Sequence, residues 1–163
     1  MYVSGFNAGH STFNFLTARP DVVVHSFDIG RARHVRKMAS YLQHEFPGRF
    51  NITIGDSRTT VRPYFTAKRS TPPITCDIIS VDGSHSSDAP LKDMLNFAQV
   101  ASQPHNVILV DDVDAPAVRK AWNFAIKSGI AQQVSLFTCR YGRESRKLFA
   151  IGTVIRKRPL AIM

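Results

Sequence analysis

The feature that most constrains the fold is a repeated order of short apolar runs and longer segments with helical spacing. Apolar runs rich in β-branched residues occur at Val22–Phe27, Ile78–Val81 and Val107–Val110. Each is followed by a segment whose apolar residues recur every three or four positions, as between Ala32 and Phe46. Because strands that alternate with helices form a parallel sheet, the sequence predicts an α/β protein.

The alternation predicts five strand–helix units and then a change of pattern. We expect the first helix at about Ser11–Ala18, with Phe13 and Leu16 facing inward, and Asp114 as the cap of the last helix. Two strand-like segments then predict a terminal hairpin with a polar turn at residues 140–146. A loop is expected at residues 68–75. No internal repeat or second domain is visible, so residues 1–163 are expected to form one domain.

The composition limits the binding partners and the cellular locations that we expect for this protein. The net charge is +9, but the basic residues are scattered and not interleaved with aromatic residues. We therefore favour a basic surface over a nucleic-acid partner. Cys76 and Cys139 lie in apolar stretches without metal-ligand spacing, which favours two buried, reduced thiols and a cytoplasmic location. We see no signal-peptide pattern and no apolar run long enough to span a membrane.

Polar residues gather where the predicted strands end. They are Gly5 to Ser11, Asp28, Asp56 with Ser57, Asp82 with His85, and Asp111 with Asp112. One aspartate after a strand usually forms a turn or caps a helix, but five strand ends in register along one edge are harder to explain in that way. Since ligands of open α/β sheets bind outside the carboxyl ends of the strands, we expect a ligand site there.

The glycine loop by itself leaves two interpretations open. Gly5 and Gly9 lack the spacing of the G-x-G-x-x-G dinucleotide fingerprint, yet the loop follows a strand and opens a helix. It is therefore either a tight turn or a loop whose backbone N–H groups face a ligand. Asp28 ends the next strand, where an acidic residue can accept hydrogen bonds from ribose hydroxyls.

Taken in order, these motifs resemble those of class I S-adenosylmethionine-dependent methyltransferases. The resemblance rests on five segments: Gly5-Phe6-Asn7-Ala8-Gly9-His10-Ser11, Phe27-Asp28-Ile29-Gly30, Gly55-Asp56-Ser57, Val81-Asp82-Gly83-Ser84-His85 and Val110-Asp111-Asp112. The nearest group contains macrocin-type sugar O-methyltransferases and is related in layout to catechol O-methyltransferases. The resemblance implies a Rossmann-like seven-stranded sheet of order 3-2-1-4-5-7-6 with strand 7 antiparallel. Relative to that family the chain is short at its N-terminus, and Val3 stands where many members have an acidic residue.

The resemblance also implies the cofactor contacts. Gly5, Asn7 and Ser11 would border the methionine part of S-adenosylmethionine. Asp28 would hold the ribose, and Asp56 and Ser57 would flank the adenine. Because the N-terminal segments of the family are missing here, we expect an isolated monomer to bind the cofactor weakly, and we leave open whether the chain forms a homodimer.

In metal-dependent members, Mg²⁺ or another divalent cation is held by carboxylates that match Asp82, Asp111 and Asp112. The physics agrees, because neighbouring strands lie about 4.8 Å apart and carboxylates at their ends converge. His85 would take the proton of the acceptor hydroxyl, so Asp82 and His85 are the candidate catalytic residues. The alternatives are that Asp112 caps a helix, Asp111 binds a backbone N–H, and His85 is a surface histidine.

Three functions follow in order of preference. The first is metal-assisted O-methylation of a small hydroxylated molecule, because the carboxylate cluster would repel phosphate-rich substrates. The second is a non-catalytic or truncated methyltransferase-fold module with a binding role. The third, suggested by the net charge, is a nucleic-acid methyltransferase or binder.

Overall fold

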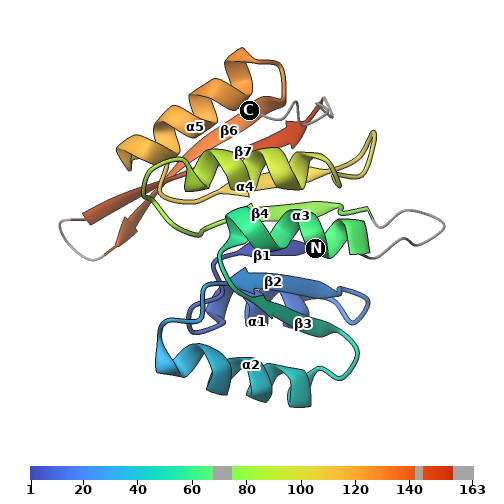
Figure 1. The fold of residues 1–163 in the computed structure, drawn as a ribbon. Coiled ribbons are helices and arrows are strands. Elements are labelled where there is room, and N and C mark those ends of the chain that lie inside the picture. Colours follow the sequence, from blue (N-terminus) through green and yellow to red (C-terminus); the bar gives the residue numbers. More distant parts are fainter. Residues whose placement is uncertain (68–74, 142–144, 156–163) are drawn as a thin grey trace.

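The computed structural model describes residues 1–67, 75–141 and 145–155, and its elements follow the predicted order (Figure 1). The strands are β1 (Tyr2–Ser4), β2 (Val24–Asp28), β3 (Phe50–Ile54), β4 (Ile78–Val81), β5 (Val107–Val110), β6 (Ala131–Tyr141) and β7 (Ser145–Val154). The helices are α1 (His10–Ala18), α2 (Arg33–Glu45), α3 (Ser57–Ala67), α4 (Ala89–Ala98) and α5 (Pro116–Lys127). Most of the predicted loop at 68–75 and the tip of the predicted hairpin turn lie outside the described residues.

All seven strands form one sheet in the order β3-β2-β1-β4-β5-β7-β6. The pairs among β1 to β5 are parallel, whereas β7 runs antiparallel to both β5 and β6. The predicted fold is therefore confirmed, including its antiparallel strand. At the centre, Ser4 of β1 stands beside Phe27 of β2 and Val81 of β4. The strand order reverses at this point, and such a reversal opens a crevice at the carboxyl ends of the strands.

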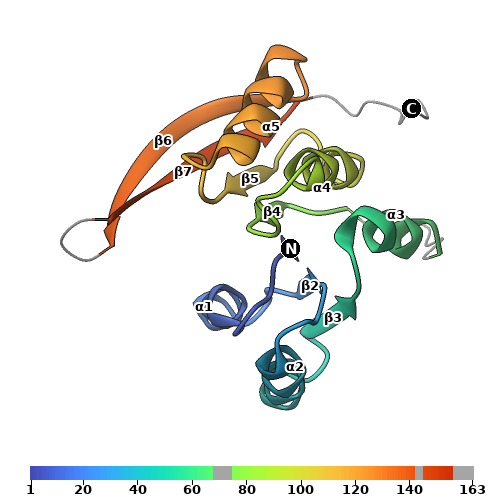
Figure 2. The ribbon, with the colours of Figure 1, turned by 60° about the vertical axis from the view of Figure 1, so that its left-hand side comes forward.

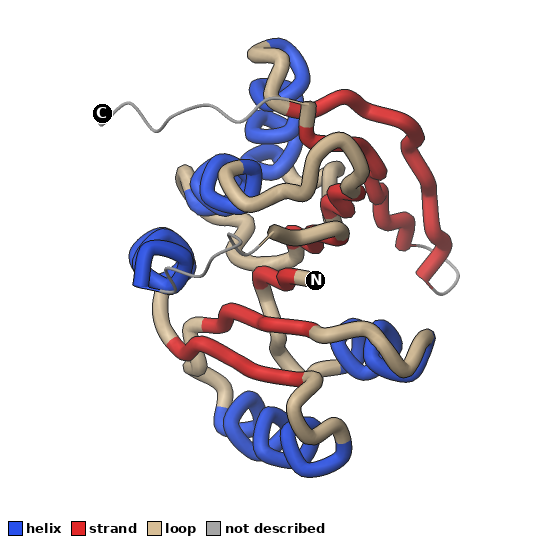
Figure 3. The backbone as a smooth tube through the Cα atoms, turned by 90° about the vertical axis from the view of Figure 1, so that its right-hand side faces the viewer, coloured by secondary structure: helices blue, strands red, loops and turns tan. Residues whose placement is uncertain are grey.

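Helices cover the sheet on two sides (Figure 3). On one side, Leu16 of α1 and Leu42 of α2 pack with Val3 and Val24. On the other, residues of α3, α4 and α5, including Phe97 and Trp122, pack against the strands. Since successive strand side chains point to opposite faces, each buried strand supplies both layers. This packing fixes the strand ends that carry the polar residues.

Helix α1 differs from the prediction in one side chain. Leu16 is buried as expected, but Phe13 is 41% exposed, so its predicted inward orientation is wrong. The buried face of α1 is formed by Thr12 and Leu16, which are four residues apart and share one side of the helix. Phe13 lies one position round the helix and instead makes an edge contact with Phe46, with ring centroids 5.9 Å apart.

The hairpin of β6 and β7 brings two further corrections. Cys76 is buried and free, as predicted, but Cys139 is exposed because β6 is the edge strand and extends past α5 (Figure 2). Asp114 does not cap α5, whose N-cap is Ala115. Its Oδ1 accepts a hydrogen bond of 3.1 Å from the backbone N–H of Leu148, so Asp114 ties β7 to the end of β5 instead.

Candidate active site

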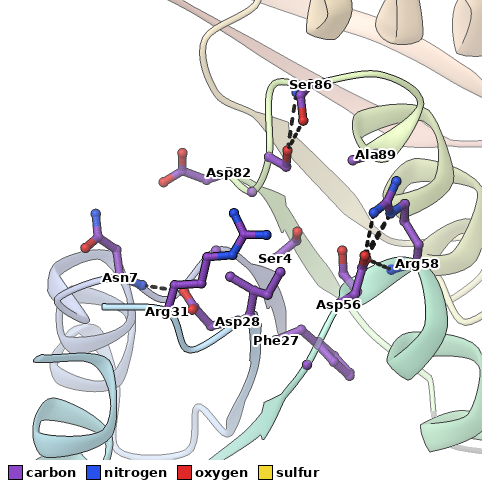
Figure 4. Close-up of a pocket in the computed structure, with 16 residues that line it drawn as sticks. Ser4, Asn7, Phe27, Asp28, Arg31, Asp56, Arg58, Asp82, Ser86 and Ala89 are labelled. Carbon is purple, nitrogen blue, oxygen red and sulfur yellow. Dashed lines mark hydrogen bonds and ion pairs between the residues drawn. The ribbon is translucent and has the colours of Figure 1, made fainter. Parts of the chain in front are cut away.

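A cavity of about 380 Å³ opens where β1, β2, β3 and β4 end (Figure 4). Six of its lining residues are those expected at a cofactor site or beside it: Gly5, Asn7, Asp28, Asp56, Ser57 and Asp82. Ser11 lies in the first turn of α1 and is not among the lining residues. The structure thus brings together side chains from four strand ends, as the parallel topology predicts.

The glycine loop after β1 lies directly against the end of β4. The N–H of Gly5 donates to the Phe27 carbonyl at 2.9 Å, and its φ is +86°. A Cβ at this position would come within 1.9 Å of the Asp82 carbonyl oxygen. Only glycine therefore allows this approach together with the left-handed backbone. The loop is a tight turn and also a wall of the cavity, but its Gly5 and Gly9 N–H groups bond within the protein, so N–H groups that face a ligand stay a prediction.

Asp28 holds the loops on both sides of β2. Its Oδ2 accepts hydrogen bonds from the N–H groups of Phe6 at 3.0 Å and Asn7 at 2.9 Å. Its Oδ1 accepts one from Gly30 N–H at 2.7 Å. The Asn7 side chain is in turn held by His34, with Asn7 Oδ1 and His34 Nε2 2.8 Å apart. Asp28 therefore shapes the glycine loop, and its predicted ribose contact stays a prediction.

At the end of β3, Asp56 is engaged by an arginine. Both of its carboxylate oxygens lie 3.0 Å from Arg58 Nε, and this ion pair lowers the pKa of Asp56. Arg58 also reaches Asp88, at 3.4 Å. Arg31 and Arg58 line the cavity, and sequence reasoning missed both. The available signal was their position directly after two of the strand-end motifs.

A buried carboxylate lies beneath the cavity, where the sequence showed only a helical residue. Asp93 of α4 is 1% exposed, and its Oδ2 accepts a hydrogen bond from the Ser4 hydroxyl. Its Oδ1 has no hydrogen-bond partner among the described residues. Burial raises the pKa of this carboxyl group. A Cβ on Gly83 would come within 2.5 Å of Ser4 Oγ, so a side chain at this position would displace the Ser4 hydroxyl.

The ends of β4 and β5 form a second group of carboxylates beside the cavity, and we call Asp82, Asp111 and Asp112 the acidic rim. The pKa of Asp82 is raised to about 7, first by burial and then by the charges of Asp111 and Asp112. Asp111 Oδ1 accepts the N–H of Asp112 at 2.6 Å, and Asp112 has a φ of +51°. Asp82 belongs to both the cavity and the rim and therefore joins them.

His85 and Lys147 both contact the Asp112 carboxylate. His85 Nε2 lies 3.2 Å from Asp112 Oδ2, and Lys147 Nζ lies 3.0 Å from Asp112 Oδ1. The predicted metal ligands were Asp82, Asp111 and Asp112. Within the described parts of the chain, the potential ligand atoms that gather within 4.8 Å of one another come from Asp82, His85 and Asp112. Asp82 and Asp112 are common to both sets.

The family follows from comparison with known proteins. The profile of a family described as a methyltransferase domain matches residues 3–113, which is more than half of the chain. The chain belongs to this methyltransferase family. The resemblance to class I S-adenosylmethionine-dependent methyltransferases is thereby confirmed. Comparison with curated proteins gave no match.

Solved structures share the fold of this methyltransferase. The O-methyltransferase TomG of Streptomyces achromogenes, in complex with S-adenosylmethionine, is 17% identical with a TM-score of 0.74 over 94% of this chain and 71% of that one. The Bacillus cereus O-methyltransferase with S-adenosylhomocysteine is 13% identical, with a TM-score of 0.75 over 94% and 73%. A rRNA methylase of Streptococcus thermophilus is 11% identical, with a TM-score of 0.65 over 95% and 86%.

Among the described helices of this methyltransferase, none has the length and apolar character to cross a membrane.

Proposed function

We propose that this methyltransferase transfers the methyl group of S-adenosylmethionine to a hydroxyl of a small molecule, with help from a divalent cation. The observation that carries the proposal is the continuity of the cavity with the acidic rim through Asp82. A cofactor site thus adjoins a place where an acceptor hydroxyl can be bound and deprotonated.

The cavity fits the cofactor in size and charge. Its volume of about 380 Å³ is within the range of small-molecule sites. Asp28, Asp56 and Asp82 line it together with Arg31 and Arg58, so it offers both carboxylates and guanidinium groups to a cofactor that carries a sulfonium, an ammonium and a carboxylate. As the family resemblance implies, we assign the ribose to Asp28, the adenine to Asp56 and Ser57, and the methionine part to Gly5 and Asn7. The resemblance also gives Ser11 to the methionine part, although Ser11 does not line the cavity.

The rim supplies groups for the acceptor. When bound, S-adenosylmethionine offers an electrophilic methyl group, and a divalent cation lowers the pKa of the acceptor hydroxyl. Asp82 and Asp112 would hold the cation, with Asp111 as the third carboxylate of the predicted set. His85 would accept the hydroxyl proton at Nδ1, because its Nε2 lies 3.2 Å from Asp112 Oδ2 and Asp112 orients the ring through that nitrogen. Negative charge at the rim disfavours acceptors rich in phosphate.

Two broader points accompany this proposal. We propose that residues 1–163 form a single domain, since one continuous sheet runs through the described chain. We also propose the cytoplasm as the location, which two free cysteines support.

A transfer assay tests the function. The protein is incubated with S-adenosylmethionine carrying a labelled methyl group and with a catechol, a sugar polyol or a short RNA, with a divalent cation or a chelator. We expect the label in methyl ethers of the hydroxylated small molecules, less transfer with chelator, and loss of transfer in Asp82→Asn. Label in RNA, with none in small acceptors, would contradict the proposal.

A second candidate is a methyltransferase-fold module that binds without transferring a methyl group. The observation that favours it is the ion pair between Lys147 and Asp112, which already places a cation at the rim. The two candidates separate in the same assay. The module would bind the cofactor, measured by calorimetry, and leave every acceptor unlabelled whether or not a divalent cation is present.

A further inference from the structure

Lys147 is the basic side chain that contacts the acidic rim from β7. Its Nζ lies 3.0 Å from Asp112 Oδ1 and 3.2 Å from Asp112 Oδ2. The Asp112 side chain is 14% exposed and the Lys147 side chain 42% exposed. The carboxylate is therefore mostly buried, whereas the lysine has room to swing away into solvent.

The backbone fixes where Lys147 begins. Its neighbour Leu148 is tied on both sides: its N–H donates to Asp114 Oδ1 at 3.1 Å, and its carbonyl accepts from Val113 N–H at 2.8 Å. Because β7 is antiparallel to β5 and pairs its Ala150 with Val110, the last residue of β5, the β7 residues before Ala150 extend past the end of β5. The position of Lys147 at the rim is thus a consequence of strand pairing.

The rim needs positive charge. Three carboxylates converge there, and burial, followed by the like charges of Asp111 and Asp112, disfavours ionisation of Asp82 and raises its pKa. Lys147 is the nearby group that acts in the opposite direction on Asp82, and its own pKa is raised by its hydrogen bond with Asp112. An ammonium therefore already supplies part of the charge that a divalent cation would bring.

Both oxygens of Asp112 are in use. Lys147 contacts both, and His85 Nε2 lies 3.2 Å from Oδ2. A metal ion that binds Asp112 must take at least one of these oxygens, and it would then stand close to a positively charged nitrogen. Two cations on one carboxylate repel each other, so the ammonium and the metal ion cannot both keep their best positions.

We propose that Lys147 is a tethered cation that competes with a divalent metal ion for Asp112, and so sets the metal affinity of the rim. A metal ion binds when the Lys147 side chain moves into solvent, and the ammonium returns when the ion leaves. This inference deepens the proposed function, since it concerns the same rim and the metal dependence of the same reaction.

Mn²⁺ binding tests the competition without any cofactor. Mn²⁺ prefers oxygen ligands, and the electron paramagnetic resonance signal of its free aqueous form measures how much is bound. We expect Lys147→Met to bind Mn²⁺ about tenfold more tightly than wild type, or better, while Lys147→Arg stays weak. Lys127→Met makes the same change of charge at the far end of α5 and should match wild type. Adding Asp112→Asn to Lys147→Met should abolish the gain.

Equal Mn²⁺ affinity in wild type and Lys147→Met would overturn the proposal, and so would an equal gain in Lys127→Met. Thermal unfolding gives a second readout, which also serves if Lys147→Met folds poorly. Lys147→Met and the milder Lys147→Gln should melt lower than wild type without metal and regain stability with Mn²⁺. These experiments contain no cofactor, so a finding that the protein does not bind S-adenosylmethionine would not change their outcome. Likewise, a finding that Lys147 does not compete with Mn²⁺ would not contradict the proposed cofactor site.

Discussion

At the scale of single residues, Gly5 shows that a glycine which the sequence left open to two interpretations has a definite structural reason. Its spacing to Gly9 was compatible with a simple turn or with a ligand loop. The structure shows a left-handed backbone pressed against the Asp82 carbonyl, where a side chain has no room. Such a requirement depends on a strand more than 70 residues away in the chain, so local sequence alone cannot reveal it.

Gly5 and Gly48 form a matched pair for mutation. Both have positive φ, of +86° and +74°, but a Cβ on Gly48 would meet nothing within 4 Å. Alanine at either position carries the left-handed backbone cost of roughly 1–2 kcal/mol. Gly5→Ala should lose about 1–3 kcal/mol more because of the clash with β4. Urea unfolding of both variants measures the difference, and equal losses would contradict the packing described here.

Asp82 is the residue whose charge should make stability depend on pH. Its pKa is raised from 3.8 to about 7 in the folded protein, so the folded state keeps this proton over a range where the unfolded state has lost it. The free energy of unfolding therefore falls as pH rises from about 4 to about 7 through this group. Below about pH 4 the Asp82 carboxyl is protonated in both states and does not lower the free energy of unfolding. Above about pH 7 it is ionised in both states, and the loss of unfolding free energy no longer changes with pH.

The variant Asp82→Asn should remove this dependence, because its amide stays neutral. We expect its stability relative to wild type to improve between about pH 5 and about pH 8, measured by urea unfolding in the presence of a chelator. Asp21→Asn is the control. Arg19 lowers the pKa of the exposed Asp21 carboxyl, so that variant should show no such change over this range. A pH-independent difference for Asp82→Asn would show that Asp82 does not titrate as described.

At the scale of elements, β7 shows what pattern and resemblance predicted and what they did not. The hairpin and its antiparallel strand were expected, and both are present. The contact of Lys147 with the rim was not expected, because it depends on the register between β7 and β5. The predicted helix cap at Asp114 is wrong for a similar reason. An aspartate before a helix usually caps it, and only the strand register shows that the Leu148 N–H donates to the Asp114 carboxylate.

The role of Asp114 in holding β7 can be tested with two substitutions. Asp114→Ala removes the acceptor of the Leu148 N–H and should cost about 1 kcal/mol of unfolding free energy. Asp114→Asn keeps an acceptor oxygen and should lose less. Amide hydrogen exchange at Leu148 should quicken in the alanine variant. Unchanged exchange there would mean that Asp114 does not hold the strand.

At the scale of the whole molecule, the strand order and the gathering of Gly5, Asn7, Asp28, Asp56 and Asp82 at one edge were predictable. Topology alone brings the carboxyl ends of parallel strands together, and the sequence motifs identify the residues at those ends. Topology does not decide which side chains then bind one another. For that reason the bonds of Asp28 to backbone N–H groups became visible only in the structure. The same holds for the buried Asp93 oxygen, which has no partner among the residues that the structure describes.

The central claim is that the cavity at the ends of β1 to β4 binds S-adenosylmethionine. The most direct measurement is a calorimetric titration with S-adenosylhomocysteine of wild type, Asp28→Ala and Asp21→Ala. Asp28 is the last residue of β2, whereas Asp21 lies in the turn before this strand. We predict saturable binding at one site in wild type and Asp21→Ala, and loss of binding in folded Asp28→Ala. Undiminished binding in Asp28→Ala, or no binding by folded wild type, would contradict the central claim.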